Sequence, residues 1–130
     1  MKNKLLNTLI GFFILITLLY SKVLSQEFSF EAGNIQNIDE KVIKASDKVF
    51  ISDNKGIKIY AEKFTYNKEK KIFKISDNVI FLDENNLLNI KSNKTEFDEI
   101  NNVITTFGET IISQNRKYEL IGEDIIYNRN

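Results

Sequence analysis

From Phe28 to the end of the chain, a short pattern of alternating apolar and polar residues recurs about every 30 residues. Each copy begins with two apolar residues in alternation, followed by a small residue, at residues 28–32, 57–61, 88–92 and 118–122. Alternation with a period of two is typical of β-strands, and no segment of this region has the periodicity of a helix. A unit of this length cannot bury its own apolar face, so the copies must stack. The chain is therefore predicted to form an all-β, repeat-built fold.

The alternation changes phase inside each unit, which predicts that the strands bend. A second in-phase pair follows each small residue, at Ile35 and Asn37, Phe64 and Tyr66, Thr95 and Phe97, and Ile125 and Tyr127. The step from Ala61 to Phe64 is odd-numbered, so the apolar side would change face unless a bulge at residues 62–63 intervened. Polar breaks have the same effect in the second half of each unit, at residues 46–48, 76–78 and 107–109. We expect a jelly roll or partial solenoid, with two facing antiparallel sheets and an apolar interior.

Composition excludes several classes of function. The 130 residues include no Cys and no His, so no thiol nucleophile, imidazole base or zinc site of the usual kind can be built. Equal numbers of basic and acidic side chains give a net charge of zero, which provides no electrostatic case for nucleic acid. Adjacent carboxylates occur at residues 39–40, 83–84 and 98–99, but all lie in predicted turns, where solvated charge is the default. We therefore expect no enzyme activity, no cofactor or metal, and no nucleic-acid partner.

The first 25 residues have the order of a secretory signal peptide. Two lysines precede an apolar stretch over residues 9–20, and small or modest residues follow up to Ser25. This apolar core of about 12 residues is shorter than the roughly 20 needed to span a bilayer. We expect cleavage after Ser25 and a mature domain of residues 26–130, and the alternative is an uncleaved anchor over residues 5–24. Both interpretations place the rest of the chain outside the cytoplasm, and the lack of Cys excludes a lipoprotein.

Two segments carry a resemblance to a known family. Residues 59–66 combine an alternating apolar pair, Ala, two charged residues and an aromatic pair, and residues 73–79 end in Asp-Asn-Val after an alternating apolar pair. This pattern resembles the OstA-like repeat of the lipopolysaccharide-transport proteins, which include a periplasmic bridge protein and the N-terminal domain of an outer-membrane assembly protein. Family members usually carry Gly where this chain has Asp47 and Asp77. The resemblance covers residues 27–130.

The two ends of the repeat region make the chain most similar to the N-terminal part of the assembly protein. The signal is followed at once by the first unit, and the last unit stops at Asn130 before its second half. Such an unfinished edge is a liability for a free-standing domain. We expect the domain to be incomplete at this end, as a piece of a longer protein. The alternative is an edge that pairs with a neighbouring domain by strand addition.

The resemblance implies that the interior is a groove for the acyl chains of lipopolysaccharide, in the periplasm or in association with the outer membrane. The implied partners are lipopolysaccharide and other jelly-roll domains of the transport bridge, joined by edge-strand pairing. Ten inward residues are expected to line the groove and bind lipid: Ile59, Phe64, Phe73, Ile75, Val79, Phe81, Ile90, Phe97, Ile104 and Ile112.

Two other interpretations remain open. Inward apolar columns are also what any β-repeat domain uses as its core, so a structural or adhesive exported domain with a closed core has the same pattern. A membrane-anchored accessory protein of lipopolysaccharide export would keep residues 5–24. The outward columns are apolar as well, at Phe50, Ile80 and Ile111, which is consistent with a partner surface or with strand propensity alone.

Overall fold

The computed structural model describes residues 28–129. The expected signal peptide, its cleavage after Ser25 and the alternative anchor lie outside the described residues. The elements are β1 (Phe28–Glu31), β2 (Asn34–Asn37), β3 (Val42–Asp53), β4 (Ile57–Asn67), β5 (Ile72–Asp83), β6 (Leu88–Asp98), β7 (Val103–Gln114), β8 (Tyr118–Glu123) and β9 (Ile126–Asn128). Within this part of the chain, no helix is long and apolar enough to cross a membrane.

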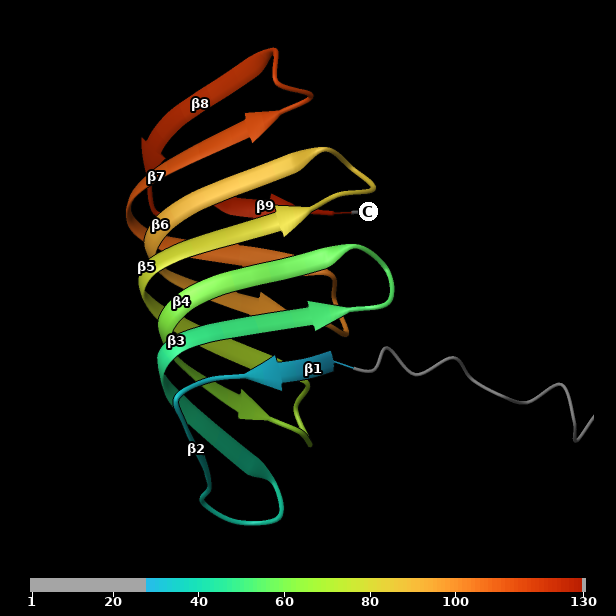
Figure 1. Cartoon of the computed structure of the whole chain (residues 1–130). Coiled ribbons are helices and arrows are strands. Elements are labelled where there is room, and N and C mark those ends of the chain that lie inside the picture. The colour runs from blue at the N-terminus through green and yellow to red at the C-terminus, as the bar shows by residue number, and fades with distance from the viewer. Residues whose placement is uncertain (1–27, 130) are drawn as a thin grey trace, which may run out of the picture.

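All nine strands belong to one antiparallel sheet, so the predicted all-β jelly-roll class is confirmed. The order along the sheet is β1-β3-β4-β5-β6-β7-β8, while β2 pairs with β3 and β9 pairs with β7. Each long strand bends near its middle and the sheet folds back on itself (Figure 1). At one edge β1 and β2 act as the two halves of a bent strand, and at the other edge β8 and β9 do the same. The two facing layers expected from the sequence are thus halves of a single folded sheet.

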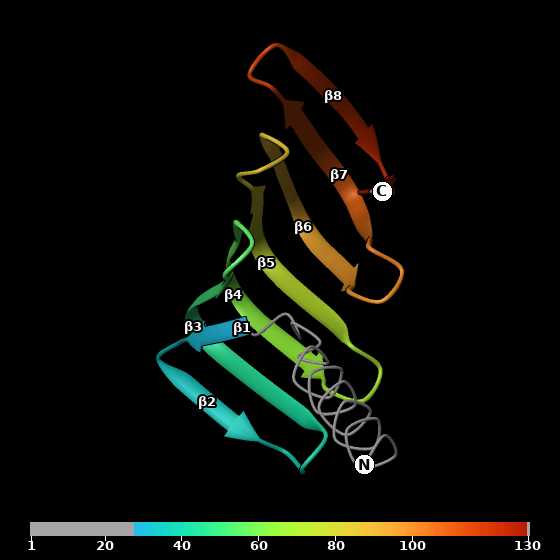
Figure 2. The same cartoon turned by 90° about the vertical axis from the view of Figure 1, so that its right-hand side faces the viewer.

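The two layers are named half-sheet 1 and half-sheet 2. Half-sheet 1 contains β1, β8 and the long-strand residues on their side of the bend: 49–53, 57–61, 79–83, 88–92 and 109–114. Half-sheet 2 contains β2, β9 and the long-strand residues 42–46, 63–67, 72–76, 94–98 and 103–107. Figure 2 shows β3 to β8 side by side in the order of the sequence. Successive repeats therefore lie next to each other, as the stacking argument requires.

The bends lie where the sequence predicts breaks. Register shifts separate the two halves of the strand pairs at Ser46/Val49, Ser76/Val79 and, at the expected bulge, Tyr60/Lys63. The backbone enters the left-handed region at the breaks within β3, β5 and β7, with φ of 70° at Asp47, 67° at Asp77 and 80° at Gly108. Asp and Gly adopt this conformation more readily than most residues, which explains why polar breaks and glycine stand at the bend rather than β-branched residues.

The core lies between the two half-sheets. Inward side chains such as Ile51, Ile104 and Phe73 are fully buried and belong to one cluster. Aromatic rings from opposite half-sheets meet there: the Phe30 and Phe64 rings stack with centroids 5.2 Å apart, and the Phe28 ring meets the Phe73 ring edge-on at 4.8 Å. Pairs of this kind add about 0.5–1.5 kcal/mol beyond the area they bury. The facing aromatic rings therefore help to hold the folded sheet closed.

The half-sheets are offset, so that the interior is uncovered at both ends of the stack. Phe28 lies on β1, which pairs with β3, yet its ring contacts Phe73 on β5 and Phe97 on β6 of the other half-sheet. Because of this offset, the inward side chains of β8, the last strand of half-sheet 1, have no facing layer, and Leu120 among them is 56% exposed. The inward side chains of β2, the first strand of half-sheet 2, are uncovered in the same way, and Ile35 is 46% exposed. The apolar interior thus continues past the closed core at each end.

Two glycines are expected to differ in their tolerance of alanine, because only Gly108 lies at a bend with a left-handed backbone. Gly108→Ala is expected to lower the free energy of unfolding by about 1–2 kcal/mol, the cost of a Cβ in the left-handed region. An added Cβ at this position meets no atom within 4 Å, so the cost comes from the backbone alone. Gly122→Ala on β8 is the matched control, because its Cβ would meet Ile125 no closer than 3.4 Å at an ordinary φ. Urea unfolding of both variants measures the difference, and equal losses would contradict this expectation.

Candidate functional site

All ten residues expected to line the groove lie in the interior. Both half-sheets contribute to this set: half-sheet 1 provides Ile59, Val79, Phe81, Ile90 and Ile112, and half-sheet 2 provides Phe64, Phe73, Ile75, Phe97 and Ile104. Their exposed fractions range from 0% to 6%. The structure therefore brings the predicted residues together in one apolar cluster, and their contact with lipid remains a prediction.

Four aromatic residues that pack in the same interior are missing from the predicted set: Phe28, Phe30, Tyr66 and Tyr127. Phe28 and Phe30 come from β1 and pack against the core, and Tyr66 stacks on Phe73 with ring centroids 4.1 Å apart. The sequence carries a signal for the first two, since they occupy the same positions in the first unit that Ile57 and Ile59 occupy in the second. Any occupant of the groove must share the interior with these rings.

The side of the molecule opposite the bend is the mouth of the interior. The turns that join consecutive strands within each half-sheet lie on this side (Figure 1): 54–56, 84–87 and 115–117 for half-sheet 1, and 38–41, 68–71 and 99–102 for half-sheet 2. Aspartate side chains shape several of these turns. Asp53 Oδ1 accepts from the backbone N–H groups of Lys55 at 2.8 Å and Ile57 at 2.7 Å. Such turns place polar groups around the rim of an apolar interior.

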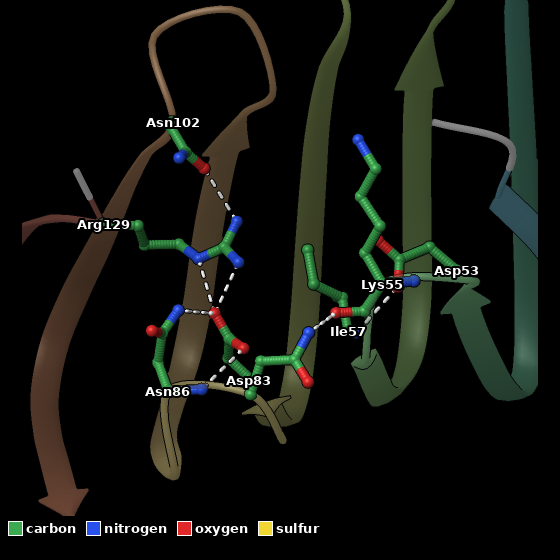
Figure 3. A network of polar contacts seen from close by, with 8 residues as sticks. Asp53, Lys55, Ile57, Asp83, Asn86, Asn102 and Arg129 are labelled. Carbon is green, nitrogen blue, oxygen red and sulfur yellow. Dashed lines mark hydrogen bonds and ion pairs between the residues drawn. The ribbon is translucent and has the colours of Figure 1, made fainter. Parts of the chain in front are cut away.

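A polar network joins the two half-sheets at the mouth (Figure 3). Arg129 directly follows β9, and its backbone N–H donates to the carbonyl of Asn102 at 3.1 Å. The Arg129 side chain donates through Nη1 to Asn102 Oδ1 at 2.7 Å and through Nε to Asp83 Oδ2 at 2.9 Å, with a second bond from Nη2 to the same oxygen. Asn86 Nδ2 also donates to Asp83 Oδ2, at 2.8 Å. Asp83 ends β5 in half-sheet 1, so this network links opposite layers.

The burial of Asp83 corrects the expectation that the adjacent carboxylates are solvated. Its side chain is 0% exposed and that of Arg129 is 11% exposed. Burial acts to raise the pKa of Asp83, but hydrogen bonds from Asn86 and the Arg129 guanidinium outweigh it and hold the pKa below its usual value. A carboxylate in a predicted turn is expected to be solvated only if nothing packs over that turn, and here the opposite half-sheet supplies Arg129.

Glu99 is a second partly buried carboxylate at the mouth. Its Oε1 atom is buried without a hydrogen-bond partner among the described residues. The pKa of Glu99 is raised, first by burial and further by the nearby carboxylates of Asp53 and Asp98, although a hydrogen bond with Tyr66 and the charge of Lys71 oppose this. Because Asp53 belongs to half-sheet 1 and Glu99 follows β6 in half-sheet 2, like charges face each other here across the mouth.

The chemistry of this arrangement suits binding of an amphiphile. The interior offers apolar side chains, and the rim offers charged groups and turn amides beside three exposed apolar side chains, Ile38, Leu87 and Ile100. Among residues 28–129, no group of three or more acidic residues could hold a metal ion. A ligand with apolar chains and a polar end would match an apolar interior with polar groups at its rim, because each part keeps its preferred surroundings.

The Asp83 network predicts a pH-dependent stability. Asp83→Asn is expected to lower the free energy of unfolding by about 3 kcal/mol at neutral pH, because it leaves the Arg129 charge without its carboxylate. The folded-state pKa of Asp83 lies below the unfolded value, so this stabilisation is fully present above about pH 4 and is lost as the pH falls through the folded pKa. Urea unfolding of wild type and variant between neutral and acidic pH measures the difference. A difference that stays constant on acidification would contradict an ionic role for Asp83.

Comparison with known proteins agrees with this geometry. A family model described as OstA-like protein matches residues 28–130. The structure is similar to the crystal structure of LptH from Pseudomonas aeruginosa, described as the LptA homologous periplasmic component of the conserved lipopolysaccharide transport device. The TM-score is 0.69 at 13% sequence identity, over 79% of this chain and 76% of that chain. At this identity the likeness is one of fold. No curated protein matches the chain.

Proposed function

The chain belongs to the OstA-like family, and from this membership we propose that it carries acyl chains of lipopolysaccharide in its apolar interior, through the periplasm toward the outer membrane. The proposal rests on the single apolar cluster between the half-sheets, which continues past the closed core at both ends. Transfer of each acyl methylene into such an interior is worth about 0.8 kcal/mol. A few chains can therefore be held by burial alone, with no catalytic group.

The repeat supports transport rather than storage. Equivalent inward positions of successive units carry similar apolar side chains, as with Ile59, Phe81, Ile90 and Ile112, which lie in one row across half-sheet 1. A lipid that moves along such a row meets a similar free energy at each step. An interior of uneven affinity would trap lipid at its tightest point. We propose further that the chain corresponds to the N-terminal part of an outer-membrane assembly protein, because its first repeat directly follows the expected signal peptide.

A closed structural domain is the second candidate, and one observation favours it. The ten predicted lining residues are nearly inaccessible, so the interior must open before a chain can enter. An exported structural or adhesive domain needs no such opening. The third candidate, an anchored accessory protein, depends on residues that the structure does not describe. Sequencing of the mature N-terminus separates it from the others, because a chain that starts at Gln26 has no anchor.

Photo-crosslinking in cells tests lipid carriage directly. A photoreactive phenylalanine analogue at Phe81, which is fully buried, is expected to capture lipopolysaccharide. The same analogue at Phe50 is the matched control, because Phe50 pairs with Tyr60 on the outward side of the same half-sheet. Capture at Phe81 without capture at Phe50 supports the groove. Capture at neither position, in a protein shown to be folded and exported, would contradict the proposal and favour the closed structural domain.

We also propose that the exposed edge at β8 pairs with another jelly-roll domain. Tyr118, Leu120 and Ile121 on this strand are 71%, 56% and 63% exposed, which is unusual for three neighbouring apolar side chains. Strand addition at an open edge gives main-chain hydrogen bonds, and here it would also cover the uncovered inward column at Leu120. The apolar interior of one domain would then continue into that of the next.

If β8 pairs with another domain of this kind, the protein is expected to associate as its concentration rises. A charged side chain introduced on β8 is expected to abolish this association. Ile121→Asp is expected to shift the protein to the monomer in light scattering coupled to gel filtration, because charged side chains on an edge oppose strand addition. Tyr60→Asp is the matched control, since Tyr60 is 43% exposed but lies on the central strand β4. Equal association of wild type and both variants would argue against pairing through β8.

A further inference from the structure

We infer that Arg129, Asp83 and Asn102 form a clasp across the mouth, and that release of this clasp opens the interior to a ligand. The inference rests on the proposed function for the identity of the ligand, an acyl chain. The clasp itself is defined by contacts between the two half-sheets and can be tested without any lipid.

The geometry of Arg129 makes it the bridging residue. Its backbone is fixed to half-sheet 2 through the carbonyl of Asn102, and its side chain reaches Asp83 in half-sheet 1 with two hydrogen bonds. Other ion pairs at the mouth have a different geometry. Lys41 pairs with Glu69 at 3.0 Å between turns of half-sheet 2, and the Lys58–Glu84 pair lies within half-sheet 1. Those pairs can persist while the layers separate, whereas the Arg129 pair cannot.

The clasp lies directly above the predicted lining of the groove. The Arg129 guanidinium carbon stands over the Phe97 ring, 5.5 Å from its centroid. Phe97 in turn contacts Phe81 at 5.4 Å and Phe73 at 6.1 Å between ring centroids. All three rings are fully buried and belong to the predicted lining. A separation of Arg129 from Asp83 would therefore uncover the apolar interior at its most aromatic part.

The pairing of β9 with β7 keeps Arg129 on half-sheet 2. The register covers three residues, and flanking backbone hydrogen bonds, one of them from Arg129 to Asn102, extend it. Separation of the two layers therefore breaks the contact of Arg129 with Asp83 and leaves the strand ladders intact.

Pulsed electron paramagnetic resonance tests the clasp. The chain has no Cys, so spin labels can be placed at Lys55→Cys and Lys70→Cys, two exposed positions on opposite sides of the mouth. In the lipid-free protein, Arg129→Gln is expected to lengthen the distance between labels by several ångströms or to broaden its distribution. Arg129→Lys, which keeps the charge but loses the planar fork, is expected to have a smaller effect in the same direction. Lys58→Gln is the matched control, since it removes an ion pair within one half-sheet.

A fluorescent acyl chain, cis-parinaric acid, reports entry in the same variants. We expect severalfold faster uptake by Arg129→Gln than by wild type or Lys58→Gln. An unchanged distance distribution in a folded Arg129→Gln variant would overturn the clasp, as would widening of the same size in Lys58→Gln. Widening in Arg129→Gln without uptake of the acyl chain would overturn the proposed function and leave the clasp standing. Circular dichroism establishes that each variant is folded.

Discussion

The burial of two facing apolar surfaces on a single bent sheet is the interaction on which the rest of this structure depends. Each long strand contributes one row of inward side chains to half-sheet 1 and another to half-sheet 2, so the bend alone brings them together. The left-handed residues at Asp47, Asp77 and Gly108 make that bend possible without breaking the strands. The turns then lie together on the opposite side and form the mouth. The apolar interior, the mouth and the exposed edges are all consequences of folding one sheet in half.

Much of the fold follows from the sequence because its two determinants, the repeat and the phase change of the alternation, are local. The repeat and the phase change at residues 76–78 predict bent, stacked strands, and the inward columns follow from alternation. The offset between half-sheets could not be predicted, because it depends on the twist of the whole sheet. The clasp depends on that offset: Asp83 and Arg129 are 46 positions apart and meet only when β5 of one layer faces β9 of the other. For this reason the sequence predicts a solvated turn at residues 83–84, whereas the Asp83 side chain is buried.

The interior can serve as a core and as a groove with the same residues. As a core it needs close packing, which the facing aromatic rings provide. As a groove it needs the layers to separate by roughly the width of an acyl chain while the strand ladders stay intact. A folded sheet allows this, because the hydrogen bonds lie within each layer and only side-chain contacts cross between layers. A buried ion pair is weak evidence for stability by itself. Its position between the layers gives the Asp83–Arg129 pair a role in holding them closed.

Methyl-resolved NMR on the isoleucine side chains, with purified lipopolysaccharide, measures whether acyl chains enter the interior. Isoleucine occurs on both faces of half-sheet 1: Ile59 and Ile90 point inward and are fully buried, whereas Ile80 and Ile111 point outward. If the interior carries acyl chains, we expect intermolecular nuclear Overhauser effects from acyl methylene protons to the inward methyl groups. Effects confined to the outward methyl groups, or none at the inward ones in a sample that binds lipopolysaccharide, would contradict this expectation.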